Sequence, residues 1–140
     1  MDLEEALPLL QENHTAVATS ITRDGRTQAT VVSTALMDGK LVFASPAQTA
    51  KVRNIQRTGR AGLTVINLDT RRYVTVEGPA SFEPWQDTPA HIKRLKDLYS
   101  ASARPPKGPD EEFAQQMRRE ERGLVFVTPE RLYGSLRRRG

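Results

Sequence analysis

The chain has 140 residues, of which 37% are hydrophobic and 27% are charged, and its formal net charge is +4 at pH 7. This length and composition predict one globular domain, residues 1–140, that buries a core without metals or staples. The absence of cysteine excludes disulfides, Cys-ligated metal centres and thiol nucleophiles. The positive charge favours anionic partners: nucleic acids, phosphorylated cofactors or acidic metabolites.

The N-terminal residues 1–13, MDLEEALPLLQEN, are acidic and amphipathic. They lack the basic start and the long apolar stretch of a signal peptide. No apolar run approaches the ~20 residues that a membrane span requires. We therefore expect a soluble, cytoplasmic protein without membrane association, and the lack of cysteine fits a reducing compartment.

The first half of the chain alternates between helical and strand patterns. Residues 2–12 predict a short helix, in which Pro8 indicates a kink or two short turns. Residues 14–45 follow as three β segments, rich in Val, Thr, Ile and Ala, with tight turns at the two Asp-Gly pairs, 24–25 and 38–39. A helix is predicted next, beginning after Ser45 or at 48–49 and ending at Gly59.

The second half begins with two further strands, residues 60–68 and 71–84, the latter with a bulge or bend at 78–79. A helical insert, residues 86–122, contains two helices around the loop RPPKGP. Two short strands end the chain. This order predicts a mainly β or α+β domain, built as a six- to seven-stranded antiparallel barrel with peripheral helices that closes to remove its edges.

Common catalytic motifs are absent from the sequence: it contains no G-x-G-x-x-G, Walker A, H-E-x-x-H or G-x-S-x-G pattern. The two histidines are far apart, so we expect no metal site and no His-based triad. His14 is predicted to be structural or at the barrel rim, and His91 to face solvent on the insert. Glu77 is expected to point outward, with a catalytic role as the alternative.

A basic cluster stands out because no Asp or Glu occurs anywhere in residues 39–68. Its members are Lys51, Arg53, Arg57 and Arg60. On the predicted helix, Val52 and Ile55 pack inward, Lys51 lies at their border, and Asn54, Arg53 and Arg57 sweep across the other side. The cluster is either a solvated basic face or a phosphate cradle, since hydroxyl groups and a helix N-terminus precede it.

An ordered series of motifs runs along the chain: DGK-LVFAS, TAKVRNI, a basic turn through Arg60, AGLTV, YVTVEGPA and, near the end, RLYG. This series resembles the flavin/deazaflavin split-barrel family related to pyridoxamine 5′-phosphate oxidase. The resemblance is densest over residues 10–85. It is greatest to the small single-domain members that use coenzyme F420.

This resemblance implies a homodimer of split barrels with two cofactors in the interface grooves. It implies that the phosphate is held around Ser45, Gln48, Thr49, Lys51 and Asn54, with Arg53 or Arg57 reaching the phosphate or the tail. The flat ring is expected against Thr30, Val31, Val32 and Ser33 and against the strand that begins at Ala61 and Gly62, where small residues leave room. Trp85, Tyr99 and Tyr133 are candidates for a wall supplied by the partner subunit, or for plain core packing.

The implied activity is an F420-dependent oxidoreductase that transfers a hydride between the reduced deazaflavin and a small organic substrate. The basic cluster favours F420, whose tail is more anionic than FMN. The alternatives are an FMN-dependent oxidoreductase or oxidase of the pyridoxamine 5′-phosphate oxidase type, a non-catalytic flavin- or F420-binding protein, or a haem- or flavin-binding regulator. Nucleic-acid binding is disfavoured because the strands lack the interleaved surface aromatics of a stacking platform. The insert either covers the groove or thickens the dimer.

Overall fold

The computed structural model describes residues 1–137, so Arg138 and Arg139 of the basic C-terminal run lie outside the described residues. Within this part the chain forms four helices and eight strands. Their bounds are α1 (Leu3–Glu12), β1 (Thr15–Ile21), β2 (Thr27–Ser33), β3 (Ala35–Met37), β4 (Lys40–Pro46), α2 (Ala50–Thr58), β5 (Arg60–Asn67), β6 (Arg72–Glu83), α3 (Pro89–Ala101), α4 (Asp110–Glu120), β7 (Arg122–Val127) and β8 (Arg131–Ser135).

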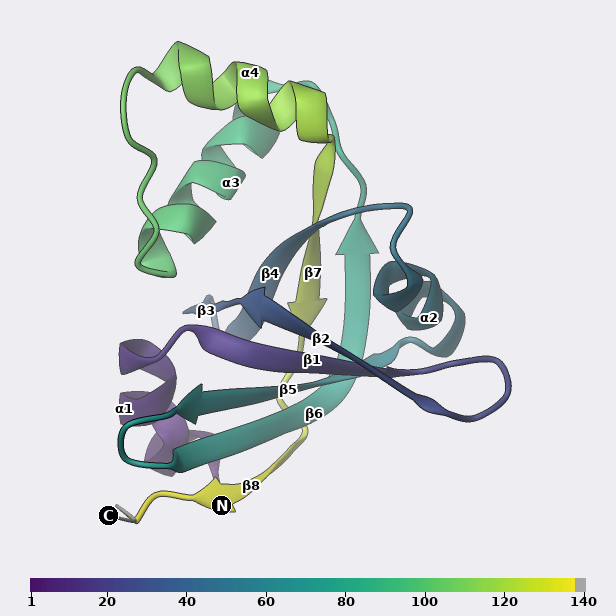
Figure 1. Cartoon of the computed structure of the whole chain (residues 1–140), viewed down its shortest axis with the longest axis vertical. Coiled ribbons are helices and arrows are strands. Elements are labelled where there is room, and N and C mark those ends of the chain that lie inside the picture. Colours follow the sequence, from purple (N-terminus) through teal and green to yellow (C-terminus); the bar gives the residue numbers. More distant parts are fainter. Residues whose placement is uncertain (138–140) are drawn as a thin grey trace.

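A single antiparallel sheet carries the fold, with the strand order β2-β1-β5-β6-β7-β4-β3 and with β8 paired to β6. The long strand β6 is the joint between its two halves (Figure 1). Residues 72–79 of β6 pair with β5, whereas residues 80–83 pair with β7. The predicted bend at Gly78-Pro79 thus falls where β6 changes partners.

The mainly β split-barrel prediction is confirmed, with two corrections. The strand expected over residues 27–37 is divided at Thr34, which raises the number of strands to eight. The Thr34 N–H donates to the carbonyl of His14 (2.8 Å) and its hydroxyl to the carbonyl of Val42 (2.8 Å). These bonds lie where the chain passes from β2, which pairs with β1, to β3, which pairs with β4. Strands β2 and β3 therefore lie at opposite edges of the sheet, and the sheet is not closed.

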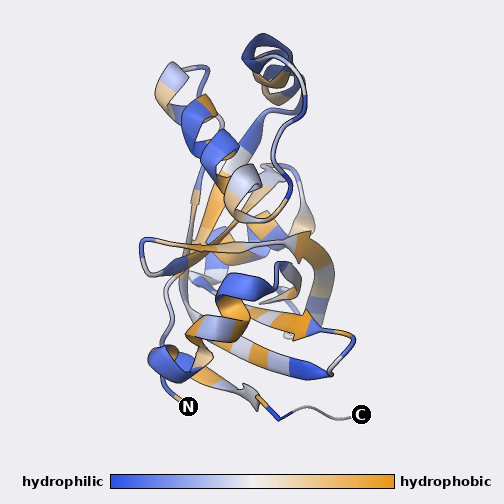
Figure 2. Cartoon of the chain, turned by 90° about the vertical axis from the view of Figure 1, so that its left-hand side faces the viewer, coloured by the Kyte–Doolittle hydropathy of each residue, from blue (hydrophilic) through white to orange (hydrophobic). Residues whose placement is uncertain are grey.

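The interior of the barrel is filled by alternate residues of its strands, seen as alternating orange and paler bands in Figure 2. Leu41, Phe43 and Val125 are fully buried there. Helix α1 packs its apolar side against the same core. Pro8 does not break α1, which is continuous from Leu3 to Glu12, so the predicted kink is not needed; the missing N–H of Pro8 removes only one helical hydrogen bond.

Helices α3 and α4, with their connecting loop 102–109, form a unit that we call the helical pair. It stands to one side of the barrel (Figure 1) and has its own small core against the outer face of β3, β4 and β7. Val42 and Leu124 project from the strands into this core, where they meet Leu95 and Leu98. Strand β4 is therefore apolar on both faces. No helix within residues 1–137 is long and apolar enough to cross a membrane.

Candidate anion-binding site

A cavity of about 360 Å³ lies where β2, the end of β4, the start of α2 and the helical pair meet. We call it the basic pocket. Three cations and no acidic residue line it among the described residues. Its lining consists of Val31, Val32, Ser33, Ala44, Ser45, Pro46, Lys51, Leu98, Tyr99, Ser102, Arg104 and Arg122.

The barrel side of the basic pocket is shaped by the start of α2. Thr49 is the N-cap of this helix and its hydroxyl accepts from the Val52 N–H (3.4 Å). The Thr49 hydroxyl also bonds the buried hydroxyl of Ser45 (3.1 Å). Because Thr49 fixes the first turn, Lys51 extends into the pocket beside free N–H groups at the positive end of the helix dipole.

Lys51 carries the clearest electrostatic signature in the basic pocket. It makes no hydrogen bond or ion pair with any described residue. Burial lowers the pKa of its ammonium below the ordinary 10.5, and the positive charge of Arg122 lowers it further. Burial and the nearby positive charge both disfavour the charged form of Lys51, and a bound anion would stabilise that form.

Arg122 reaches the basic pocket through the register of the sheet. As the first residue of β7 it pairs with Pro46 of β4, one residue after Ser45. Its carbonyl is bonded to Nε2 of the buried His91 (2.9 Å), which ties it to α3. Its Nε is buried without a hydrogen bond; the Glu120 carboxylate lies 3.4 Å away, in poor hydrogen-bond geometry. The guanidinium is therefore incompletely satisfied inside the protein.

The helical pair supplies the opposite wall. Nη1 of Arg104 donates to the hydroxyl of Ser33 on β2 (3.2 Å). Tyr99 stacks edge-on against Phe113 of α4 with ring centroids 5.4 Å apart. Burial raises the pKa of the Tyr99 hydroxyl above 10.0, although Arg122 and Arg104 oppose this shift. Tyr99 is thus a proton-holding hydroxyl close to both guanidinium groups.

The predicted binding residues divide between the basic pocket and other places. Those that line it are Val31, Val32, Ser33, Ser45 and Lys51. Thr49 acts behind it as the helix cap. Thr30 accepts from the Gln28 side chain on β2 (3.2 Å). Gln48 is exposed, and its carbonyl accepts from Nη2 of Arg53 (2.8 Å).

Two further predicted residues face the β1–β2 hairpin instead of the basic pocket. The buried Asn54 amide donates to the Ser20 hydroxyl (3.1 Å) and accepts from Nη1 of Arg57 (3.0 Å). Arg57 also bonds the carbonyl of Ile21. Both side chains therefore connect α2 to β1. The helix projection showed which side of α2 they occupy, but it could not distinguish this structural role from ligand binding.

The space predicted above Ala61 and Gly62 is filled by the protein itself. Both residues are buried in β5, between β1 and β6. A Cβ on Gly62 would lie 2.7 Å from Oγ1 of Thr19. The Thr19 side chain of the neighbouring strand thus occupies the space that a side chain at Gly62 would need.

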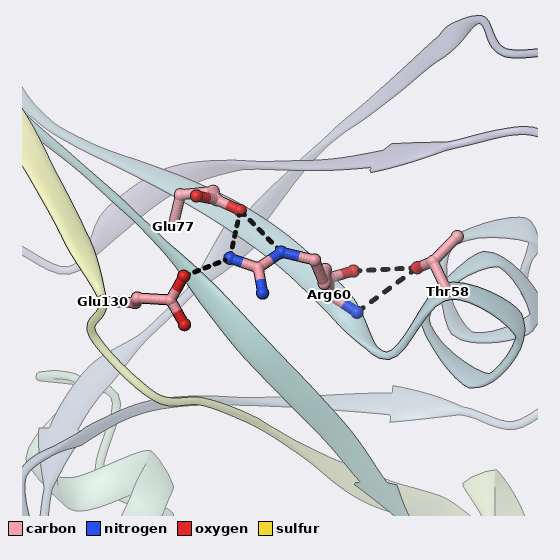
Figure 3. Close-up of polar contacts among 4 residues, drawn as sticks. All are labelled: Thr58, Arg60, Glu77 and Glu130. Atoms are coloured by element: carbon pink, nitrogen blue, oxygen red, sulfur yellow. Dashed lines mark hydrogen bonds and ion pairs between the residues drawn. The ribbon is translucent and has the colours of Figure 1, made fainter.

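The sequence interpretation of the basic cluster needs a correction, because folding brings acidic side chains to one of its members. Arg60 forms ion pairs with Glu77 and Glu130, each with a contact of 2.9 Å (Figure 3). The two carboxylates raise the pKa of Arg60 by hydrogen bonding. Glu77 is accordingly explained as a partner of Arg60. Of the three cations in the basic pocket, Lys51 and Arg104 have no carboxylate partner among the described residues, whereas Arg122 lies 3.4 Å from Glu120.

Two of the pocket cations, Arg104 and Arg122, were not predicted. Arg122 stands among acidic residues in the sequence and Arg104 lies in a loop of the insert, so neither belongs to the basic cluster of residues 51–60. The prediction that His91 faces solvent was wrong: it is 4% exposed and packs edge-on against Trp85. A signal for Arg104 was available, since RPPKGP contains two cations and no acid.

The described residues also limit the chemistry. Within residues 1–137 no group of three or more His, Asp or Glu side chains converges on a possible metal position. Tyr133 is 46% exposed on β8. Of the three aromatic candidates only Tyr99 borders the basic pocket.

The fold is that of a split-barrel protein, with a basic pocket at the start of α2. The chain belongs to the pyridoxamine 5′-phosphate oxidase family, whose family model matches residues 3–135. The resemblance expected from the sequence is thereby confirmed at the level of the family. No curated protein matches the sequence significantly.

Solved structures with the same fold extend this assignment. The conserved hypothetical protein Rv2991 of Mycobacterium tuberculosis has a TM-score of 0.74 and 22% identity, over 96% of this chain and 84% of that one. A structure described as an F420 reductase has a TM-score of 0.68 and 23% identity, over 90% and 94%. A FAD-binding protein of Mesorhizobium loti has a TM-score of 0.61 and 15% identity, over 96% and 92%. At such identities the similarity shows the fold alone.

Proposed function

We propose that this protein is an F420-dependent oxidoreductase, a reductase that transfers a hydride between the reduced deazaflavin and a small organic substrate. The cofactor is bound in a groove that a second copy of the chain completes. The observation that carries the proposal is the basic pocket, whose lining among residues 1–137 has three cations, several hydroxyl groups and no acidic side chain. Such a lining suits a ligand with more than one negative charge.

The residues of the basic pocket fit the phosphate of such a cofactor. Lys51 has no partner among the described residues, and burial lowers its pKa. Arg122 lies across from it with a buried Nε that lacks a hydrogen bond. A phosphate that contacts both cations would replace the water contacts that they have lost on burial. The first turn of α2 would also donate N–H groups to it. The pocket volume of about 360 Å³ suits the anionic end of the cofactor and leaves its ring outside.

The choice of F420 over FMN rests on charge. FMN carries one phosphate, whereas F420 carries a phosphodiester followed by carboxylates. Arg122 already has the Glu120 carboxylate 3.4 Å away, so Lys51 and Arg104 are the pocket cations without a carboxylate partner among the described residues. Anionic groups beyond the phosphate, as in F420, can reach both of them. The similarity in fold to a structure described as an F420 reductase points the same way. The FAD-binding relative keeps a flavin as the alternative that the experiment below must test.

The ring is assigned to the surface along β2, next to the basic pocket. This strand ends the sheet and pairs only with β1, so half of its backbone N–H and C=O groups have no strand partner. Val31 is 70% exposed on this strand. A flat ring on β2 needs cover on its other side, and a second copy supplies that cover in the proposed homodimer.

The bound cofactor supplies the hydride chemistry. The chain itself anchors the phosphate with Lys51 and Arg122 and presents the β2 edge to the ring. Tyr99 keeps its proton at Oη well above neutral pH, because burial raises its pKa. It therefore acts as a hydrogen-bond donor at the pocket, and a solvent proton completes the reduced product. The small number of acid–base residues is consistent with this division of work.

Equilibrium dialysis of the purified protein against F420 and against FMN tests the cofactor. Retention of F420 in preference to FMN is the expected result. Preference for FMN makes the protein an FMN-dependent member of the family, and retention of neither contradicts the proposal. Consumption of reduced F420 with a panel of activated alkenes and quinones then separates a reductase from a protein that only binds the cofactor.

Two variants of α2 provide a matched comparison. Lys51→Ala should weaken F420 binding at least tenfold, since a charged hydrogen bond to phosphate is worth about 1.5–3 kcal/mol. Arg53→Ala removes the same charge two residues away, from an exposed side chain that bonds only the Gln48 carbonyl. It should leave the affinity nearly unchanged. Equal losses in both variants would point to a general charge effect and not to an anchor.

A further inference from the structure

Arg104 holds a position that the sequence did not reveal: it bridges the helical pair and the barrel across the basic pocket. Its backbone belongs to the loop after α3, whereas its Nη1 donates to the Ser33 hydroxyl of β2 (3.2 Å). Ser33 and Arg104 both line the pocket. The guanidinium therefore closes one side of the cavity through a single contact to a neutral acceptor.

The end of α3 is built to aim this side chain. Ala103 adopts a left-handed conformation, with φ of 60°, which turns the chain sharply after the helix. The Arg104 N–H then donates to the Tyr99 carbonyl (2.8 Å), and the buried Ser102 hydroxyl donates to the same carbonyl (3.2 Å). These bonds fix the backbone of Arg104 beside Tyr99 and leave its long side chain free to change partners.

The charge of Arg104 is not balanced by a carboxylate of the described residues, unlike the charges of Arg94 and Arg118 in the helical pair. Arg94 is ion-paired with Glu83, and Arg118 with Asp87. Arg104 has only the Ser33 hydroxyl, and no acidic residue among the described ones lines its pocket. Hydrogen bonds from a guanidinium to an anion are roughly twice as strong as those to a neutral group. An anion at this wall would therefore displace Ser33.

We propose that Arg104 is a specificity-determining residue that binds a second anionic group, opposite the phosphate site of Lys51. Ligands with two linked anionic groups bridge the barrel and the helical pair and replace the Arg104–Ser33 contact. Ligands with one anionic group occupy the Lys51 side and leave that contact intact. The identity of the natural ligand rests on the proposed function, in which the second anionic group belongs to the F420 tail. The selectivity for ligands with two anionic groups does not depend on that function.

Two simple probes, inorganic pyrophosphate and orthophosphate, test this selectivity at constant ionic strength by calorimetric titration. The wild type should bind pyrophosphate at least tenfold more tightly than orthophosphate. Arg104→Ala should lose about tenfold in pyrophosphate affinity and retain its orthophosphate affinity. Lys51→Ala should lose affinity for both. Lys107→Ala, which removes a charge from the same loop outside the pocket, should match the wild type, and thermal unfolding verifies the fold of each variant.

The outcomes separate the two proposals. If Arg104→Ala weakens both probes equally, or neither, or if the wild type does not prefer pyrophosphate, the second subsite is refuted even when F420 is retained. If the pyrophosphate preference depends on Arg104 but neither F420 nor FMN is retained in dialysis, the subsite stands and the proposed function falls. With F420 retained, Arg104→Ala should also reduce the preference for F420 over FMN.

Discussion

Replacing Gly78 by alanine should disrupt the joint of the sheet. Gly78 lies in β6 just before the strand changes partners, and its backbone needs no left-handed conformation. A Cβ at this position would lie 1.9 Å from the carbonyl oxygen of Thr128 and 3.1 Å from the Glu130 backbone nitrogen. Ordinary contacts begin at 3.4 Å, so the segment after β7 must withdraw by about 1.5 Å (3.4 − 1.9).

That withdrawal breaks two backbone hydrogen bonds. One joins the Thr128 N–H to the Pro79 carbonyl (2.8 Å), and the other joins the Glu130 N–H to the Glu77 carbonyl (3.1 Å). Each contributes about 1 kcal/mol, and the overpacking adds about 1–3 kcal/mol. We expect Gly78→Ala to lower the free energy of unfolding by about 3–5 kcal/mol, and Tm by roughly 10–20 °C.

The assay is urea unfolding followed by circular dichroism, with Gly39→Ala as the matched control. Gly39 has a φ of 77° and open space around its Cβ position. Its replacement therefore costs only backbone strain, about 1–2 kcal/mol. If Gly78→Ala proves less destabilising than Gly39→Ala, the backbone of β6 and the segment after β7 is not the fixed joint inferred from these contacts.

Three further changes test other parts of the structure. Thr49→Ala should lower the free energy of unfolding by about 1 kcal/mol through loss of the α2 cap, measured by urea unfolding, and Thr49→Ser should retain most of it. Arg60→Ala should change stability little, and any difference should vanish at high salt because its ion pairs are exposed. Because the pKa of Lys51 lies below 10.5, wild-type affinity for orthophosphate should fall as pH rises through that lowered pKa; titrations of Lys51→Met should show no such fall. Lys51→Met should also raise the unfolding free energy at neutral pH, since native Lys51 gives up its proton more readily than the unfolded side chain.

The elements could be predicted from the sequence wherever one local rule decided them. The Asp-Gly turns and the Gly59 end of α2 each follow from the chemistry of one or two residues. The sequence narrows the start of α2 to Ser45 or residues 48–49, and the structure places its cap at Thr49. The division at Thr34 could not be predicted in this way. Its bonds run to His14 and Val42, partners that only the folded sheet brings to it.

The lining of the basic pocket could be predicted where its residues are close in the chain, and not where strand pairing or helix packing brings distant residues together. Ser45, Thr49 and Lys51 follow one another closely in the chain, so their meeting at a helix start is a local matter. Arg122 comes to the same place through the pairing of β4 with β7, and Arg104 through the packing of the helical pair. Contacts between residues so far apart leave no periodic trace in the sequence.

The distribution of acidic residues along the sequence did not predict which cations lack a carboxylate partner in the folded protein. Arg57 and Arg60 stand without nearby acids in sequence, yet in space Arg57 bonds carbonyl and amide oxygens and Arg60 bonds two carboxylates. Arg104 has no carboxylate partner among the described residues and bonds the neutral Ser33 hydroxyl. The buried Nε of Arg122 lacks a hydrogen bond although Glu120 lies 3.4 Å away. A cation that folding leaves without a carboxylate, at a cavity wall, is one that a ligand can still complete. By this reasoning, we expect the barrel at Lys51 to set cofactor affinity and the helical pair to set selectivity among anionic cofactors.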